Sequence, residues 1–280
     1  MLLGARGMLG YDLAATAPED MVLFAFSRAA LDLTHRRALA AKIAEVKPDL
    51  IVNAAAYTAV DEAESEPRVA FNVNGEAVQE LAVICADEGI RVVHFSTDYV
   101  FDGTSRLPYR EDAPTRPVNV YGASKLAGEV ALQESGAQYL IIRTQWLFGV
   151  HGRSFPRTMW ERAVQRIPTR VVADQTGRAT YTRDLAGGAW DLIRRNASGV
   201  FHLANEGQVT WYDIAEFVFR LCGCPVLLSR CTTSEYPTPA HRPLFTVLEC
   251  TKFEETTGRT LPCWQDAVTR YLAAVGPHKP

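Results

Sequence analysis

Short apolar runs alternate with longer segments of helical spacing through the first 150 residues of the chain. The apolar runs, which we expect to form strands, lie at residues 1–3, 21–26, 49–53, 91–95 and 139–143. The segments between them have the pattern of helices at residues 11–17, 35–46, 67–88 and 121–134. The run at 49–53 shows no alternation, which is typical of a parallel strand covered on both faces. The pattern predicts an α/β fold with a Rossmann-like, doubly wound parallel sheet.

The pattern is looser beyond residue 150. Helices are expected at 155–165, 184–196, 211–222 and 264–275, strands at 169–173 and 200–203, and a proline-rich loop at 236–243. We therefore expect a Rossmann domain over residues 1–149 and a smaller lobe over 150–280. Some of the later residues, about 180–205, are expected to return to the Rossmann domain.

Composition narrows the class of protein. The 280 residues carry a net charge of about −3, which favours neither nucleic acid nor an anionic membrane as a partner. No apolar run approaches the roughly 20 residues that cross a bilayer, and no secretory signal is recognisable at the start. Six scattered cysteines, with Cys222-x-Cys224 too closely spaced for a zinc pair, are expected to be reduced thiols. We expect a cytoplasmic protein.

A glycine-rich turn follows the apolar start, with Gly4, Gly7 and Gly10 in the spacing G-x-x-G-x-x-G. Glycines allow a tight turn and let the backbone approach a pyrophosphate, while the following helix offers free N–H groups. A dinucleotide is therefore the expected ligand. Only three residues precede Gly4, so the chain is either trimmed or begins on a short strand.

The residues after the second and third apolar runs bear on the choice of cofactor. Arg28 stands where an acidic residue would bind the ribose hydroxyls of NAD, so the extra phosphate of NADPH meets a cation. This predicts NADPH, with NADH as the alternative if Arg28 is only a surface residue. After the third run, small residues would let a cofactor lie close to the backbone at Ala54, Ala55, Ala56 and Tyr57.

A second motif combines Tyr121 and Lys125, which lie four residues apart on one helix face. A phenol alone titrates near pH 10, and a neighbouring ammonium is expected to lower its pKa toward the working range. Upstream, Ser96, Thr97 and Asp98 end the fourth apolar run, where ligands of open α/β sheets gather. Alone, the pair would be a surface tyrosine beside a solvated lysine. With the glycine turn and these hydroxyls it predicts proton transfer to a carbonyl substrate.

These motifs resemble those of the extended short-chain dehydrogenase/reductases, and within them the dTDP-4-dehydrorhamnose reductase family. The matching segments follow the family's order over nearly the whole chain, at residues 4–10, 52–61, 96–103, 121–125, 143–149, 174–177 and 184–186. The resemblance implies an NADPH-binding domain over 1–149 and a mainly substrate-binding lobe over 150–280. It also implies the reduction of a 4-keto sugar nucleotide.

The resemblance further implies roles for individual residues. Thr97 would hydrogen-bond the 4-keto oxygen, Tyr121 would be the general acid, and Lys125 would hold the nicotinamide ribose and lower the pKa of Tyr121. Asp98, Tyr99 and Trp146 would line the sugar pocket, although Trp146 could equally be a core aromatic. Cofactor contacts would come from Gly4, Arg6, Gly7, Met8, Leu9 and Gly10 at the pyrophosphate, Arg28, Asp32 and Leu33 around the adenosine, and Ala54, Ala55, Ala56 and Tyr57 along its length.

The chain departs from the family pattern at several positions. Arg178, Ala179 and Thr180 stand where the family has a residue followed by Pro-Thr, which weakens the expectation for the substrate lobe. Some relatives bind magnesium at a dimer contact, and Asp12 occupies the place of one such acid. No full ligand set can be traced, so no metal site is predicted, and a homodimer stays an expectation.

Two alternatives to the reductase remain. One is a non-catalytic, nucleotide-binding regulatory subunit resembling the beta subunit of methionine adenosyltransferase. The other is a different reductase, epimerase or dehydratase of sugar nucleotides. The residues Thr97, Tyr121 and Lys125 weigh against a pure scaffold. The dehydratases usually carry Asp-Glu after the catalytic Thr, and this chain has Asp98-Tyr99 there.

Overall fold

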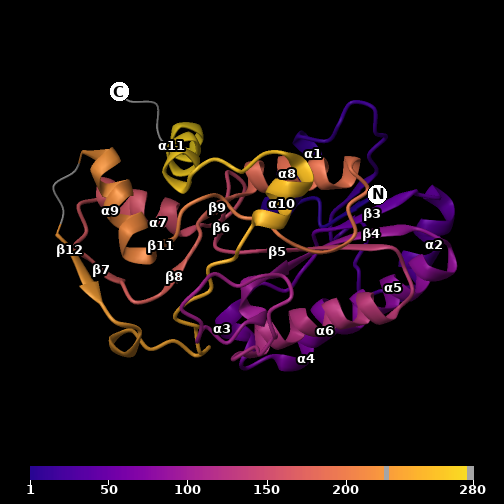
Figure 1. Ribbon diagram of the computed structural model, residues 1–280, viewed down its shortest axis with the longest axis horizontal. Coiled ribbons are helices and arrows are strands. Elements are labelled where there is room, and N and C mark those ends of the chain that lie inside the picture. Colours follow the sequence, from indigo (N-terminus) through magenta and orange to yellow (C-terminus); the bar gives the residue numbers. More distant parts are fainter. Residues whose placement is uncertain (224–226, 276–280) are drawn as a thin grey trace.

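A six-stranded parallel sheet forms the centre of the molecule (Figure 1). The computed structural model describes residues 1–223 and 227–275. The strand order is β10 (Gly199–His202), β5 (Tyr139–Thr144), β4 (Arg91–Thr97), β3 (Leu50–Asn53), β1 (Leu2–Leu3) and β2 (Ala25–Phe26). All five pairings are parallel, so the carboxyl ends of the strands share one edge.

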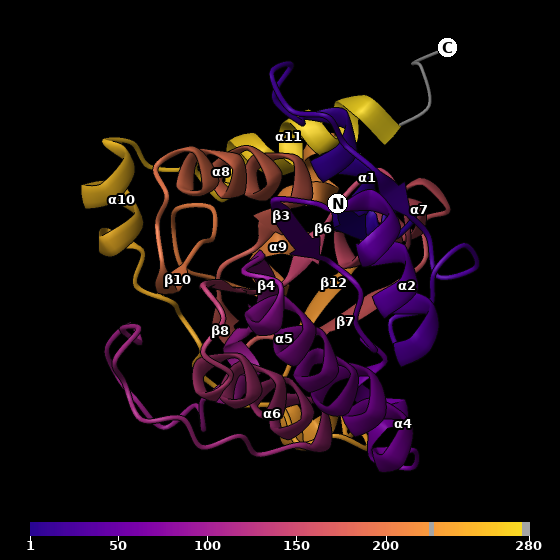
Figure 2. The same cartoon turned by 90° about the vertical axis from the view of Figure 1, so that its right-hand side faces the viewer.

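Helices cover both faces of this sheet, as Figure 2 shows. One face packs against α1 (Met8–Ala15) and α8 (Thr182–Arg194), and the other against α2 (Arg36–Val46), α5 (Ala77–Asp87) and α6 (Val120–Glu134). Successive strand residues enter opposite cores: Leu2 packs toward α1 and α8, whereas Leu3 packs toward α2 and α5. The predicted doubly wound α/β fold is confirmed.

The helix predicted at 67–88 is divided into three parts. These are α4 (Pro67–Phe71), a π-helical turn η1 (Asn72–Glu76) and α5, with a short α3 (Val60–Ala63) before them. The π turn lies against α6, where a Cβ on Gly128 would stand 2.2 Å from the Asn74 carbonyl oxygen. Glycine at 128 thus permits the close approach, and the side chain of Asn74 is turned toward the site. The helical spacing of apolar residues did not reveal the π-helical turn.

The edge strand is shorter than predicted. Only Ala25–Phe26 of the expected 21–26 run forms β2, because this strand lies at the sheet edge, where Val22 and Phe24 are exposed. The central strand β1 has two residues, Leu2 and Leu3, paired on both sides. The predicted 11–17 helix begins earlier, at Met8 immediately after Gly7.

A second core lies beyond the carboxyl edge of the sheet. It is formed by α7 (Phe155–Val164), α9 (Trp211–Cys222), α11 (Trp264–Val275) and the parallel pair β7 (Thr169–Val172) and β12 (Leu228–Cys231). Two-residue strands connect it to the sheet region: β6 (Leu147–Phe148) with β9 (Thr180–Tyr181), and β8 (Thr176–Gly177) with β11 (Val209–Thr210). These pairs and α10 (Thr251–Thr257) were not predicted, because segments this short carry no periodicity.

Within the segment at about 180–205, α8 and β10 lie against the central sheet. Helix α8 covers the sheet beside α1, and β10 is the sixth strand, paired with β5. The division of the chain at residue 149 stays a prediction. No helix within residues 1–223 and 227–275 is long and apolar enough to span a bilayer.

Candidate active site

A cleft of about 470 Å³ opens at the carboxyl ends of the central strands. The glycine turn, the segment after β3, the end of β4, the start of α6 and the segment after β5 all contribute to its wall. The lining includes Gly7, Met8, Leu9, Ala54, Ala56, Thr97, Asp98, Tyr99, Tyr121, Lys125 and Trp146. These lining residues span positions 7 to 146 of the sequence. The glycine turn, the end of β4 and the Tyr121/Lys125 pair, which the sequence indicated separately, therefore meet in one cavity.

The glycine turn brings the start of α1 against the segment after β3. Gly4 has φ of +76°, and a Cβ there would stand 2.6 Å from the Ala55 nitrogen. A Cβ on Gly10 would stand 2.1 Å from the Gly4 carbonyl oxygen. Glycine at these positions keeps the turn tight and leaves the N-terminus of α1 facing the cleft, as a phosphate site requires. Gly4 and Arg6 of this turn and Gly10 of α1 do not line the cleft itself.

The side chain of Asn74 fixes the segment after β3. Its Oδ1 accepts from the Tyr57 nitrogen at 2.9 Å, and its Nδ2 donates to the Tyr57 carbonyl and to Ser124 Oγ on α6. Ala54 and Ala56 consequently line the cleft, whereas Ala55 and Tyr57 do not. The Tyr57 hydroxyl instead donates to Glu66. Placing the predicted cofactor along this segment stays a prediction.

Tyr121 lies in the first turn of α6. The helix begins at Val120 because the Asn119 side chain accepts from the Gly122 nitrogen at 2.7 Å and donates to the His241 carbonyl. The Tyr121 ring packs edge-to-face on Tyr99, with centroids 5.9 Å apart. Burial raises the pKa of its phenol, and a hydrogen bond with Thr97 opposes that rise. At neutral pH the phenol thus carries its proton, the form in which it can act as an acid.

Lys125 is held within the sheet, and its expected effect on the pKa of Tyr121 stays a prediction. Its Nζ donates to the Phe95 carbonyl at 2.7 Å and lies 3.1 Å from His94 Nε2, so it is directed into the sheet. The side chain is 1% exposed. Burial lowers its pKa to about 8, while the charge of Glu129 acts in the opposite direction. Lys125 nevertheless lines the same cleft as Tyr121.

Thr97 and Asp98 form a hydroxyl–carboxyl pair next to Tyr121. Thr97 Oγ1 donates to Asp98 Oδ1 at 3.0 Å and accepts from the Tyr99 nitrogen. Burial raises the pKa of Asp98 to about 7, against hydrogen bonds with Thr246 and Thr97 that lower it. Asp98 Oδ2 has no partner among the described residues. The pair therefore places polar atoms beside the Tyr121 phenol, and below about pH 7 the Asp98 carboxyl is mostly uncharged.

Trp146 is both a cleft residue and a stacked aromatic, so the two interpretations of it are compatible. Its ring stacks on Trp211 with centroids 3.8 Å apart and an interplanar angle of 14°. Its backbone has φ of +47°, a conformation that bulky residues rarely adopt. Such strain is concentrated at ligand sites, and here it turns the indole toward the cleft.

The residues predicted for the adenosine lie outside this cleft. Arg28 and Asp32 line a separate depression of about 530 Å³ with His35. Arg28 Nε donates to Asp32 Oδ2 at 3.0 Å, and the Arg28 side chain is 82% exposed. The hydrogen bonds that Asp32 accepts from Thr34 and Arg28 lower its carboxyl pKa, although burial acts against them. The side chain of Leu33 is buried in the core toward α2 and lines neither cavity. The adenosine roles stay predictions.

Several cleft residues were missed from the sequence. Arg242 comes from the proline-rich segment, where it donates to the Tyr99 hydroxyl at 3.2 Å and to Asp61 Oδ2 at 2.8 Å. Trp211 and Arg153 also reach the cleft from the C-terminal region. Ser96, noted from the sequence at the end of β4, lines the cleft as well, and position at the end of β5 could have identified Thr144 and Gln145.

A larger cleft of about 640 Å³ adjoins the first, since Trp211 and Arg242 line both. It carries Arg162 and Arg170 together with Phe155 and Tyr236. Cations and aromatic rings in one cavity suit an anionic ligand with a flat ring. The two clefts together offer room for a ligand much larger than a simple sugar.

A metal site finds no support in the part of the chain that is described. No cluster of three or more potential ligands occurs within residues 1–223 and 227–275. Asp12 is buried, and its carboxylate accepts a hydrogen bond from Thr182. Cys224 of the Cys222-x-Cys224 pair lies outside the described residues, and Cys85, Cys231, Cys250 and Cys263 are thiols.

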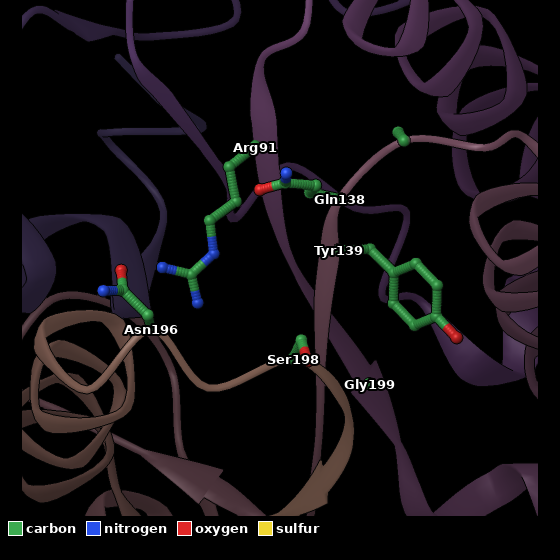
Figure 3. A pocket seen from close by; sticks show the side chains of 7 residues that line it. Arg91, Gln138, Tyr139, Asn196, Ser198 and Gly199 are labelled. Carbon is green, nitrogen blue, oxygen red and sulfur yellow. The ribbon is translucent and has the colours of Figure 1, made fainter.

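The opposite ends of the same strands border another cavity, of about 500 Å³ (Figure 3). Arg91 reaches from β4 toward the loop that carries Asn196, as the figure shows. Its Nη1 donates to the Ile193 carbonyl at 3.2 Å and its Nη2 to the Ala197 carbonyl, at the end of α8. Apart from Arg91, the described lining contains neutral residues, namely Ala137, Gln138, Tyr139, Asn196, Ser198 and Gly199.

The glycine turn after β1, Thr97 at the end of β4, and Tyr121 and Lys125 one turn apart on α6 together define an extended short-chain dehydrogenase/reductase. The model of the RmlD substrate binding domain matches residues 1–276. The chain belongs to this family.

Individual relatives match over nearly their whole length. A dTDP-4-dehydrorhamnose reductase of Burkholderia thailandensis is 42% identical, covering 96% of both chains. A dTDP-4-keto-6-deoxy-D-glucose reductase of Streptomyces niveus is also 42% identical, covering 96% of this chain and 95% of that one. The crystal structure of a dTDP-4-dehydrorhamnose reductase from Bacillus anthracis in complex with NADP superposes with a TM-score of 0.94, at 32% identity over 98% of both chains.

Proposed function

We propose that this protein is a reductase that uses NADPH to reduce the 4-keto group of a dTDP-4-dehydro-6-deoxyhexose, converting dTDP-4-dehydrorhamnose to dTDP-L-rhamnose. The observation that carries the proposal is the protonated, half-buried Tyr121 beside Thr97, in a cleft whose other wall is the glycine turn. An acid next to a phosphate-binding turn is what the reduction of a carbonyl by a dinucleotide requires.

The residues present fit NADPH. The close-packed turn at Gly4 and Gly10 leaves the N-terminus of α1 free for the pyrophosphate, and Arg28 lies near the predicted adenosine end. When bound, NADPH supplies the hydride. Lys125, which lines the cleft and donates to the Phe95 carbonyl, would bind the nicotinamide ribose. NADH is the alternative cofactor if the exposed Arg28 makes no phosphate contact.

The protein's own part in the reaction is proton transfer and stabilisation of charge. Tyr121 donates its phenolic proton to the substrate's 4-oxygen, while Thr97 holds that oxygen through a hydrogen bond. Burial of Tyr121 keeps the proton in place until negative charge develops on the substrate. A positioned acid of this kind contributes roughly 100- to 10,000-fold in rate. Asp98, Tyr99 and Trp146 would orient the sugar.

The nucleotide half of the substrate would occupy the adjoining cleft. Arg242 lies at the junction of the two cavities, which suits the diphosphate, and Arg162 and Arg170 lie further along. Tyr236 and Trp211 offer rings against which a base can stack. The dTDP identity itself is taken from the names of the relatives.

The relatives also support a second candidate for the sugar. The protein from Streptomyces niveus is named for dTDP-4-keto-6-deoxy-D-glucose, at the same identity as the relative named for dTDP-4-dehydrorhamnose. A regulatory subunit without catalysis would have no need for the acid at Tyr121 next to Thr97. We further propose a cytoplasmic location and a homodimer as the working assembly.

Turnover provides the direct test. The purified protein is mixed with each of the two dTDP-4-keto sugars and NADPH, and oxidation of the cofactor is followed by its absorbance. The proposal expects multiple turnovers with dTDP-4-dehydrorhamnose, and faster ones than with the second sugar. Binding of NADPH without oxidation, with either sugar, would instead identify a regulatory protein.

A further inference from the structure

Three buried side chains form a continuous line below the catalytic cleft. Asn53 on β3, His94 on β4 and Lys125 on α6 are each 1% exposed or less. Asn53 Nδ2 lies 3.1 Å from His94 Nδ1, and His94 Nε2 lies 3.1 Å from Lys125 Nζ. Asn53 belongs to the family-matching segment at 52–61 but received no role, His94 belongs to no motif, and the reaction described above uses neither.

The orientation of Asn53 decides which nitrogen of His94 carries the proton. Asn53 Oδ1 accepts from the Ala55 nitrogen at 3.1 Å, so its NH2 group faces the imidazole. An amide NH2 can only donate, which makes His94 Nδ1 the acceptor. A neutral imidazole has one acceptor nitrogen, and Nε2 therefore carries the hydrogen.

The hydrogen on Nε2 points at Lys125, and this conflicts with an ammonium there. An ammonium has three donors and no acceptor, so it cannot accept from Nε2–H. A neutral amine can accept from Nε2–H while it still donates to the Phe95 carbonyl. The hydrogen bonds thus fit an uncharged Lys125 in this position, and protonation would push Nζ away from His94 and toward the cleft.

We propose that His94, oriented by Asn53, is a positioning residue that favours the uncharged, retracted form of Lys125 in the free protein at pH 8 and above. Binding of NADPH then draws one proton from solvent onto Nζ and moves the resulting ammonium to the ribose. The proton goes to the nitrogen lone pair and no other bond is made or broken. This inference rests on the proposed use of NADPH.

The charged groups around Lys125 do not by themselves explain why it would be uncharged. On α6 itself, Glu129 faces Lys125 but is held by the Arg143 guanidinium of β5 in a buried ion pair, with a contact of 2.6 Å. Just after β4, Asp98 is directed to Thr97 and Thr246. From α6, Tyr121 is bound to Thr97 and stays protonated. Among the described residues on β3, the group that faces His94 is the neutral amide of Asn53. Burial lowers the pKa of Lys125 to about 8 and that of His94 well below its usual range.

Proton uptake on NADPH binding tests the proposal without any turnover. Calorimetric titrations are run at pH 9 in two buffers of different ionisation enthalpy, well above the range in which the cofactor's own phosphate titrates, near pH 6. The parent protein should take up close to one proton per NADPH at pH 9 and about half a proton at pH 8. Its NADPH affinity should fall by up to about tenfold per pH unit above 8.

Two variants remove the Nε2–H that points at Lys125 in independent ways. In His94→Gln the amide oxygen can accept from an ammonium, and in Asn53→Asp the carboxylate accepts from Nδ1–H and leaves Nε2 as an acceptor. Either variant should reduce uptake at pH 9 by more than half. Lys125→Met should abolish it. His202→Gln is the matched control: His202 is also buried, but it binds the Tyr109 carbonyl and should leave uptake unchanged.

The outcomes separate the two proposals. NADPH binding by the parent without proton uptake at pH 9 overturns the role of His94 and leaves the reductase intact. Unchanged uptake in a folded His94→Gln or Asn53→Asp variant does the same. If His94→Gln does not fold, Asn53→Asp decides alone. Absence of NADPH binding at any pH contradicts the proposed function itself.

Discussion

The two ends of the central strands carry cavities of similar size and opposite character. At the amino ends, the Arg91 guanidinium donates to carbonyls at the end of α8, where a cation also suits the helix dipole. At the carboxyl ends, four buried polar atoms have no partner among the described residues: Ser96 Oγ, Asp98 Oδ2, Thr144 Oγ1 and Gln145 Nε2.

The difference separates structural polarity from functional polarity. A buried polar group without a partner costs roughly 1–3 kcal/mol, so a fold retains one where something else depends on it. All four atoms belong to residues that line the proposed catalytic cleft. Polar groups at the amino ends contribute to holding α8 on the sheet, whereas those at the carboxyl ends are available to a ligand.

Replacing Tyr121 tests the catalytic end most severely. Tyr121→Phe keeps the ring and its edge-to-face contact with Tyr99 but removes the proton donor. We expect kcat to fall by roughly 100- to 10,000-fold, with NADPH affinity within about threefold of the parent. Stopped-flow oxidation of NADPH and a fluorescence titration give the two numbers. Turnover within threefold of the parent would mean that the proton comes from another group.

The burial of Asp98 should make the free energy of unfolding depend on pH. Its pKa of about 7 in the fold, against about 4 in the unfolded chain, means that the folded state binds the proton more tightly. Stability from this group is complete below about pH 4 and is lost as the pH rises through 7. Asp98→Asn avoids this loss, because the amide does not ionise.

Comparing the parent protein with Asp98→Asn isolates the free energy lost when the buried Asp98 carboxyl ionises. Between pH 4 and pH 8 the unfolding free energy of Asp98→Asn should rise relative to the parent, by at most about 4 kcal/mol. Urea unfolding at the two pH values measures it. A constant difference between variant and parent would show that the carboxyl is not perturbed. Turnover of the variant should fall as well, since Asp98 accepts from the Thr97 hydroxyl.

Much of the fold could be predicted because its signals are local. The helix at Trp211–Cys222 and that at Trp264–Val275 occur with the predicted bounds, and each apolar run of the first half forms a strand. The glycine turn, Thr97 and the Tyr121/Lys125 pair meet in one cleft because parallel strands bring their carboxyl ends together.

The remainder depends on contacts between distant segments. Arg242 reaches the cleft from more than 100 residues beyond Tyr121, and nothing in its proline-rich surroundings indicates that. The retracted Lys125 follows from His94, which lies on a neighbouring element and has the appearance of an ordinary strand residue. The π turn at Asn72–Glu76 follows from packing on Gly128. Such features need the tertiary structure, because no short-range pattern encodes them.

Cofactor choice gives a smaller effect. Arg28→Ala should reduce the preference for NADPH over NADH by about tenfold in kcat/KM and leave the NADH value unchanged. The exposure of Arg28 and its ion pair with Asp32 place the effect at the lower end of a charge-assisted contact. Asp32→Asn is the matched opposite: it frees the guanidinium, and the preference for NADPH should rise severalfold. Equal losses with both cofactors in Arg28→Ala would show that this loop does not bind the phosphate.

The smallest kinetic effect is expected at the opposite end of the strands. Arg91→Met keeps much of the aliphatic stem but removes the hydrogen bonds to the Ile193 and Ala197 carbonyls. We expect kcat and KM to stay within twofold, because β4 separates this cavity from the cleft. The free energy of unfolding should fall by about 1–3 kcal/mol, since the end of α8 loses its donors. Steady-state kinetics and urea unfolding of the same preparation measure both. A loss of turnover without a loss of stability would show that the amino-end cavity takes part in the reaction, and the contrast between the two ends of the sheet would then be wrong.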